Sequence, residues 1–224
     1  MKIRHQVSDA LLLDYATGVL SEGWRIAIAT HLALSPQSRR RLALMEMAGG
    51  ALVRDLPPEP SPLDEERSWM ALIRRLENSK TQDEAPPPGR NPQNAASVVL
   101  PEPLRSYVGG DVASVKWRPL GRGAYHLPIA VDDKNTMVRL LRIPAGKPVP
   151  EHGHRGRELT LVLSGSFRDG EALFARGDLE EADETLQHQP VATEGEDCIC
   201  LAVTDAPLKF RSWLVRAVQP ILGI

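Results

Sequence analysis

Hydrophobic residues in the first third of the chain recur at the three- and four-residue spacing of amphipathic helices. Ser8 can cap a first helix, "DALLLDYATGVL", and the pattern breaks at Gly18 before a second helical segment, "SEGWRIAIATHLAL". Two further segments begin with a serine before a proline, at Ser35-Pro36 and Ser61-Pro62, and proline is favoured at the first helical position. The pattern predicts four helices within residues 1–78, packed as a small bundle.

The chain changes character after residue 78. Residues 79–97, "SKTQDEAPPPGRNPQNAAS", are polar, contain a proline triplet and show no apolar periodicity, which is typical of a linker. Beyond it the apolar runs are short and are broken by Gly, Pro and acidic turns, as in "ELTLVLSGSF" and "CICLAV". Such strands favour an antiparallel barrel or sandwich. We therefore expect two domains, a small all-α four-helix domain over residues 1–78 and an all-β domain over residues 98–224.

The composition is that of an ordinary globular protein and excludes several classes of function. Hydrophobic residues make up 42% and charged residues 25% of the 224-residue chain, and a net charge of -2 gives no reason to expect binding to nucleic acid or membranes. No apolar run approaches the roughly 20 residues of a transmembrane helix, and the first residues lack a signal-peptide core. The two cysteines provide no disulfide framework. We expect a cytoplasmic protein.

Three potential metal ligands stand close together in "PEHGHRGRELTLVLSG". His152, His154 and Glu158 share one parity, so on a strand they would face the same side, while the leucines that follow have the opposite parity. Imidazole and carboxylate groups suit a first-row cation such as zinc, iron or manganese. A fourth ligand must come from elsewhere, and His188 in "LQHQP" precedes another expected strand. The alternative is a pair of solvated loop histidines beside a capping glutamate.

This stretch resembles the first cupin motif. In "GKPVPEHGHRGRELTLVLSG" the motif's glycines stand at positions 146 and 165, around the His-x-His pair and the glutamate. The second cupin motif is partial, because "GDLEEADETLQHQPVA" supplies its glycine and its histidine but lacks the P-x-G turn and the closing asparagine. The resemblance implies that the all-β domain is a cupin barrel with its metal at His152, His154, Glu158 and His188.

The N-terminal third resembles the zinc-binding anti-sigma domain, whose signature is an early histidine followed by His-x3-Cys-x2-Cys. His5 and His31 hold the histidine positions here, but Ser35 and Ser38 stand where the two cysteines would be. Neutral hydroxyls are poor zinc ligands beside thiolates, so we expect the N-terminal zinc site to be weakened or empty. The alternative functions are a helix N-cap for Ser35 and an ordinary helix-end histidine for His31.

The order of helical domain, linker and cupin resembles the ChrR-type anti-sigma factors across essentially the whole chain. The resemblance implies that the helical domain binds and inhibits an extracytoplasmic-function (ECF) sigma factor as a heterodimer, without direct contact with nucleic acid or membrane. It also implies that the cupin holds zinc, in preference to iron or manganese, and senses singlet oxygen or organic peroxide.

An apolar stripe on the last predicted helix fits this partner. Trp69, Met70, Leu72 and Ile73 lie beside the linker, and a helix can lay such a face into a groove of another protein. The alternative is that the stripe packs inside the helical bundle.

Two hypotheses remain open for the C-terminal half. Cys198 and Cys200 share one strand face, and they are either small apolar core residues or thiols whose oxidation disturbs the neighbouring metal site. The competing function for the chain is an enzyme, a cupin dioxygenase or isomerase using iron or manganese at the same four ligands. The N-terminal resemblance favours the anti-sigma function over the enzyme.

Overall fold

The computed structural model describes residues 3–57, 65–80, 98–121, 123–133, 135–206 and 209–210. Its contacts divide the chain into two compact units, one formed by Met1–Glu46 with Val99–Ile224 and the other by Met47–Val98. In the part of the chain that the structure describes, no helix is both long and apolar enough to cross a membrane.

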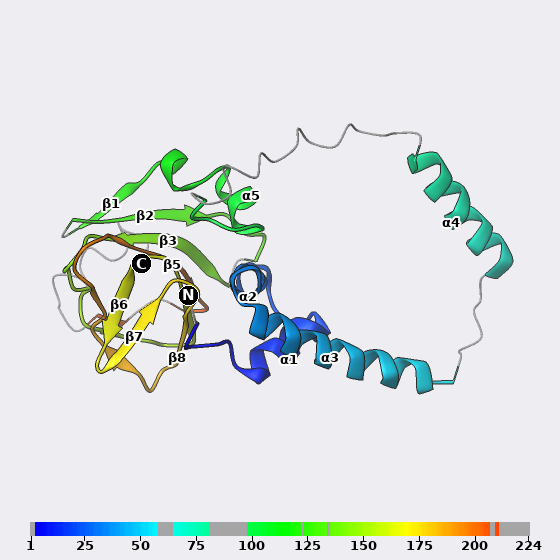
Figure 1. Cartoon of the computed structure of the whole chain (residues 1–224), viewed down its shortest axis with the longest axis horizontal. Helices are drawn as coiled ribbons and strands as arrows, with labels where there is room; N and C mark the ends of the chain where they lie inside the picture. The colour runs from blue at the N-terminus through cyan, green and yellow to red at the C-terminus, as the bar shows by residue number, and fades with distance from the viewer. Residues whose placement is uncertain are drawn as a thin grey trace. The chain divides into compact units, whose positions relative to one another are not determined.

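The β-domain of the first unit consists of antiparallel strands arranged in three sheets (Figure 1). The largest sheet has the order β1-β2-β3-β11-β5-β8, and two smaller sheets have the orders β10-β6-β7 and β12-β4-β9. The strands are β1 Arg118–Gly121, β2 Ala124–Ile129, β3 Met137–Ile143, β4 His152–Gly153, β5 Glu158–Ser164, β6 Ser166–Asp169, β7 Ala172–Ala175, β8 Leu179–Ala182, β9 Gln187–His188, β10 Val191–Ala192, β11 Cys198–Thr204 and β12 Lys209–Phe210. A short helix, α5 (Leu104–Val108), and a 3-10 turn, Val112–Ser114, precede them. The predicted all-β C-terminal domain is confirmed.

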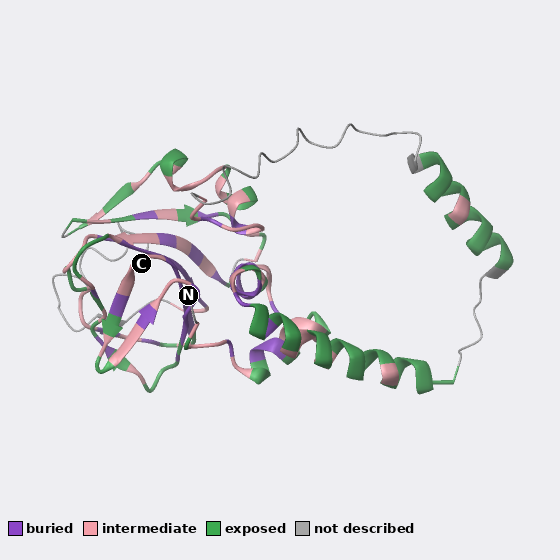
Figure 2. Cartoon of the chain, in the orientation of Figure 1, coloured by how far each residue is buried: buried purple, intermediate pink, exposed green. Residues whose placement is uncertain are grey.

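Strands β5 and β11 separate two hydrophobic cores, because alternate side chains of a strand point to opposite faces. Leu159, Leu161 and Leu163 belong to the larger core, whereas Val162 lies in the smaller core inside the β-domain. Figure 2 shows both strands as almost continuously buried. The parity predicted for the run after Glu158 is therefore confirmed, and it leaves Glu158 on the inner face.

Helix α2 (Glu22–Leu34) packs against the outside of the large sheet, and helix α1 (Asp9–Thr17) packs against α2. The Ser8 hydroxyl accepts a hydrogen bond from the Leu11 amide at 3.3 Å, and α1 ends at Gly18 in the left-handed conformation, with φ of 75°. Helix α2 contacts β5 and β11, and its apolar residues join the core of the sheet. The helical residues in that shared core are Leu11, Leu12, Trp24, Ile26, Ala27, Ile28 and Leu32.

The four predicted helices are confirmed, and they differ in how many side chains they bury. Helix α2 has buried residues on most of its circumference and needs cover on more than one side, which the sheet supplies. Helix α3 (Pro36–Asp55) begins after the capping Ser35 and buries only Ser38. Helix α4 (Glu65–Lys80) exposes every side chain described between residues 66 and 78 except that of Ile73, which is half-buried. Most of the predicted linker, residues 81–97, lies outside the described residues.

Candidate metal centre

Three histidine side chains converge inside the β-domain. His152 lies on β4 and is paired in register with His188 on β9, and His154 follows β4 directly. The Nε2 atom of His188 lies 3.1 Å from Nε2 of His152 and 3.2 Å from Nε2 of His154. All three rings are buried. The structure thus brings together three of the four predicted ligands, although His188 lies 34 residues after His154 in the sequence.

The hydrogen-bond acceptors beside two of these rings indicate which ring nitrogen carries the proton and which is free to bind an ion. His152 Nδ1 lies 2.8 Å from the Pro150 carbonyl oxygen, and His188 Nδ1 lies 3.0 Å from Asp169 Oδ2. Both oxygens are acceptors, so each Nδ1 donates its proton, and the lone pair that can bind a cation lies on Nε2. Burial lowers the pKa of His152, which favours its neutral form. Two lone pairs at 3.1 Å repel each other unless a cation lies between them, so the residues present fit a metal ion.

Glu158 stands beside the three imidazoles. Its Oε1 accepts a hydrogen bond from the Thr160 hydroxyl at 2.9 Å, and its Oε2 lies 3.3 Å from His154 Nδ1. Both Oε2 and this Nδ1 are buried without a hydrogen bond, as expected of groups that turn towards an ion. Burial raises the pKa of Glu158, but the rings of His154 and His152 outweigh it and hold the pKa below its ordinary value. The carboxylate is therefore available as a ligand, and its direct coordination remains a prediction.

Two carboxyl groups that were not predicted from the sequence, those of Asp169 and Glu180, lie beside His188. Asp169, at the end of β6, accepts from His188, and Glu180 Oε1 on β8 lies 4.0 Å from the same His188 Nδ1. A carboxylate on the far nitrogen of a metal-binding histidine fixes its orientation and tautomer. Burial, the charges of Asp169 and Glu158 and a hydrogen bond with Asp169 raise the pKa of Glu180 to about 8, so Glu180 is mainly protonated at neutral pH. The alternation of apolar Leu179 with acidic Glu180 is the sequence signal that could have indicated an acid on the inner face of β8.

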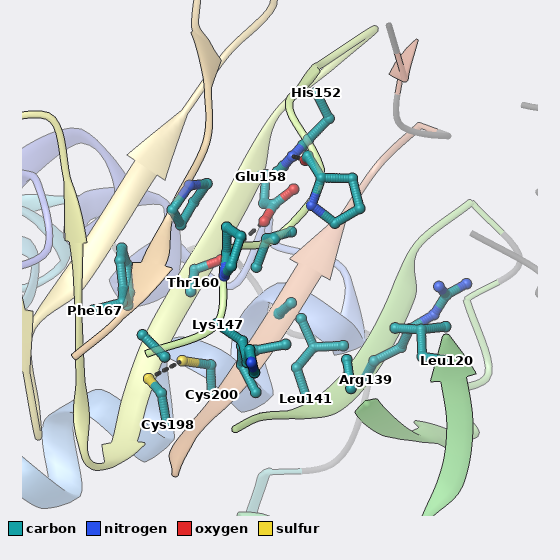
Figure 3. Close-up of a pocket in the computed structure, with 18 of the residues that line it drawn as sticks. Leu120, Arg139, Leu141, Lys147, His152, Glu158, Thr160, Phe167, Cys198 and Cys200 are labelled. Carbon is teal, nitrogen blue, oxygen red and sulfur yellow. Dashed lines mark hydrogen bonds between the residues drawn. The ribbon is translucent and has the colours of Figure 1, made fainter. Parts of the chain in front are cut away.

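His152, His188 and Glu158 form part of the wall of a cavity of about 280 Å³ whose remaining wall is mainly apolar. Figure 3 shows His152, Glu158 and Thr160 near one end of this cavity, with Cys198 and Cys200 towards the other. The two sulfur atoms lie 3.5 Å apart, and both thiols are buried. A hydrogen bond with Cys198, together with burial, raises the pKa of the Cys200 thiol. The predicted common face of the two cysteines is confirmed.

Comparison with known proteins assigns the chain to a family. The family described as the ChrR cupin-like domain matches residues 106–207. The anti-sigma-E factor ChrR of Cereibacter sphaeroides is 46% identical over 224 residues, which cover 100% of both chains. This chain belongs to the ChrR family of anti-sigma factors. A crystal structure of Rhodobacter sphaeroides SigE in complex with the anti-sigma ChrR matches 91% of this chain and 100% of that chain, at 42% identity and a TM-score of 0.73.

The N-terminal residues of this ChrR-family chain differ from the predicted arrangement. His31, Ser35 and Ser38 are buried together at the junction of α2 and α3. The side chain that reaches them from the N-terminal segment is Gln6, with Oε1 2.6 Å from both serine hydroxyls. His5 instead stacks against Phe174, with ring centroids 4.2 Å apart. Neighbouring residues of an extended segment point to opposite sides, so Gln6 and not His5 occupies this position.

The predicted partner-binding residues of this ChrR-family chain lie on α4. Trp69 is 61% exposed, Met70 48% and Leu72 46%, whereas Ile73 is half-buried. A second set of exposed apolar residues on or just after α3 consists of Leu44, Met47, Leu52, Val53 and Leu56.

Proposed function

We propose that this protein is a cytoplasmic anti-sigma factor that binds an ECF-type sigma factor and inhibits it. The observation that carries the proposal is the exposed apolar face of α4. Helix α4 buries none of the side chains described between residues 66 and 78, although Trp69, Met70 and Leu72 are large and apolar. A stable helix of this kind is expected to be covered by a partner, in the way that an amphipathic helix fills a groove. The likeness to a ChrR crystallised with SigE identifies the class of partner.

We also propose that the cupin centre holds zinc through His152, His154, Glu158 and His188. Three imidazoles and one carboxylate match the ligand types that zinc prefers in a four-coordinate site. A site closed by four protein ligands stabilises structure, whereas a catalytic site keeps a position open for water or substrate. When bound, the ion would link β4, β5 and β9, the elements that carry these residues.

The signal that we propose for this cupin is singlet oxygen or an organic peroxide. The cavity beside the metal ligands offers a mainly apolar space of about 280 Å³, and Cys198 and Cys200 form part of its wall. An oxygen atom added to either buried sulfur would need hydrogen bonds that the mainly apolar wall does not provide. Such a modification would therefore displace the strand that carries it, which neighbours Glu158 and Thr160 in the sheet.

The same cavity favours one second candidate function, a cupin dioxygenase or isomerase with iron or manganese. A mainly apolar pocket beside a metal is where such an enzyme would hold its substrate. We propose that the chain is not an enzyme, because it is 46% identical to an anti-sigma factor and α4 presents an apolar face suited to a partner protein. Oxygen consumption by the iron-loaded or manganese-loaded protein with a diketone or thiol substrate would reverse this assignment.

The full-length chain should be co-expressed with candidate ECF sigma factors, captured by an affinity tag and assayed for bound protein and for metal. The expected result is a complex of one chain with one sigma factor and one equivalent of zinc in the cupin. A folded, zinc-loaded chain that captures none of the ECF sigma factors of its own organism would refute the function proposed here.

A further inference from the structure

Four polar side chains form a closed hydrogen-bonded cluster where the N-terminal segment meets α2 and α3. They are Gln6, His31, Ser35 and Ser38, and the last three are buried. Gln6 Oε1 lies 2.6 Å from both serine hydroxyls, and Ser38 Oγ lies 2.9 Å from His31 Nε2. The Ser38 amide donates to Ser35 Oγ at 3.1 Å, which is the N-cap bond of α3.

The atoms of His31 and Gln6 that face away from the two serines are also hydrogen-bonded. His31 Nδ1 lies 3.0 Å from the Gly177 carbonyl oxygen, which can only accept, so Nδ1 carries the proton. His31 Nε2 then accepts the one hydroxyl proton of Ser38, and the Ser35 hydroxyl donates to Gln6 Oε1. The Gln6 amide nitrogen donates to the Ile3 carbonyl at 3.2 Å. None of the buried side-chain atoms of these four residues lacks a hydrogen-bond partner, in contrast to His154 and Glu158 at the cupin centre.

These residues do not fit a zinc ion. Two neutral hydroxyls and an amide oxygen supply no negative charge, and zinc in four-coordinate protein sites is bound by thiolate, imidazole or carboxylate. The single lone pair of His31 Nε2 faces the Ser38 hydroxyl. An ion could bind only by breaking these hydrogen bonds, without gaining an anionic ligand in return.

We infer that this ChrR-family chain has no metal in its N-terminal region and that the Gln6–His31–Ser35–Ser38 hydrogen bonds take the place of one. The cluster fastens the N-terminal segment to α2 and α3, and through the Gly177 carbonyl it fastens α2 to the turn between β7 and β8. The helical region then neither loses its fold to chelators nor offers thiolates to an oxidant. Metal-dependent control of this chain is confined, within its described residues, to the cupin centre.

The arrangement of these side chains also indicates which substitutions would restore an N-terminal zinc site. The side chain at position 6 faces Ser35 and Ser38, while His5 lies against Phe174. Zinc ligation therefore needs a histidine at position 6 as well as cysteines at positions 35 and 38. Three full-length proteins make a matched set: wild type, Ser35→Cys/Ser38→Cys, and Gln6→His/Ser35→Cys/Ser38→Cys.

The inference is tested by measuring the number of zinc ions per chain in each of these proteins. The affinity for zinc is measured by competition with a chelator. Wild type should hold only the cupin equivalent, and the triple variant should gain a second with at least tenfold higher affinity than the double variant. A second zinc in wild type that His31→Gln removes would overturn the inference, and so would a folded triple variant that gains none. In addition, Ser38→Ala should lower the melting temperature without changing the metal content, whereas loss of metal from this variant would contradict the inference.

Discussion

Replacing Trp69 by alanine removes the largest exposed apolar side chain of α4. Trp69 is 61% exposed, so a side chain that can bury about 250 Å² has about 150 Å² available for a partner. At about 25 cal/mol per Å², covering this area contributes at most about 4 kcal/mol. Tryptophan truncations at interface centres cost about 2 to 4 kcal/mol. We expect a loss of about 2 to 3 kcal/mol, which raises the Kd for the sigma factor about 30- to 160-fold.

The assay is calorimetric or fluorescence titration of the full-length chain with its sigma factor. Alanine has the higher helix propensity, so the substitution does not unfold α4, and circular dichroism checks this. Tyr125→Ala is the matched control, because Tyr125 is an exposed aromatic residue on β2, 38% exposed. Its Kd should change less than about twofold, as for ordinary surface substitutions. Equal affinities of wild type and Trp69→Ala would refute the assignment of α4 to the partner.

Three further predictions concern the β-domain and His31. His152→Ala with His154→Ala should abolish metal binding in elemental analysis, and a variant that keeps its metal would rule out the proposed centre. Cys198→Ala/Cys200→Ala should retain metal and sigma binding but not release the partner under singlet oxygen, whereas normal release would leave the cysteines with a packing role only. Burial lowers the pKa of His31 to about 4, while an unfolded histidine titrates near about 6.5. The unfolded chain therefore binds the proton first, so the free energy of unfolding should fall as the pH drops from about 6.5 towards 4, by about 2 kcal/mol at about pH 5. Denaturant titrations should show this contribution in wild type and not in His31→Gln.

Local sequence pattern predicted the features that depend on neighbours along the chain. Ser8 and Gly18 bound α1 as expected, because capping and left-handed glycine depend on a few adjacent residues. The inward parity of Glu158 on β5 followed from strand geometry alone. The convergence of His188 with the His-x-His pair came from the cupin resemblance, and pairing of β4 with β9 brings them together.

Features that depend on tertiary packing were not predictable from one sequence. Asp169 meets His188 because β10, which begins three residues after His188, pairs with β6, and nothing near Asp169 in the sequence marks it as a partner. Helix periodicity showed that α2 has an apolar face, but not that the β-sheet covers it. His5 matched a family pattern, yet the orientation of the N-terminal segment places Gln6 in the cluster instead.

Transcription by purified RNA polymerase with the captured ECF sigma factor tests the central claim most directly. The full-length chain should abolish sigma-dependent transcripts when it is added in equimolar amount to the sigma factor. A Trp69→Ala/Leu72→Ala variant with unchanged metal content should require a large excess to do so. Undiminished transcription with the wild-type chain, or equal inhibition by the two proteins, would contradict the account.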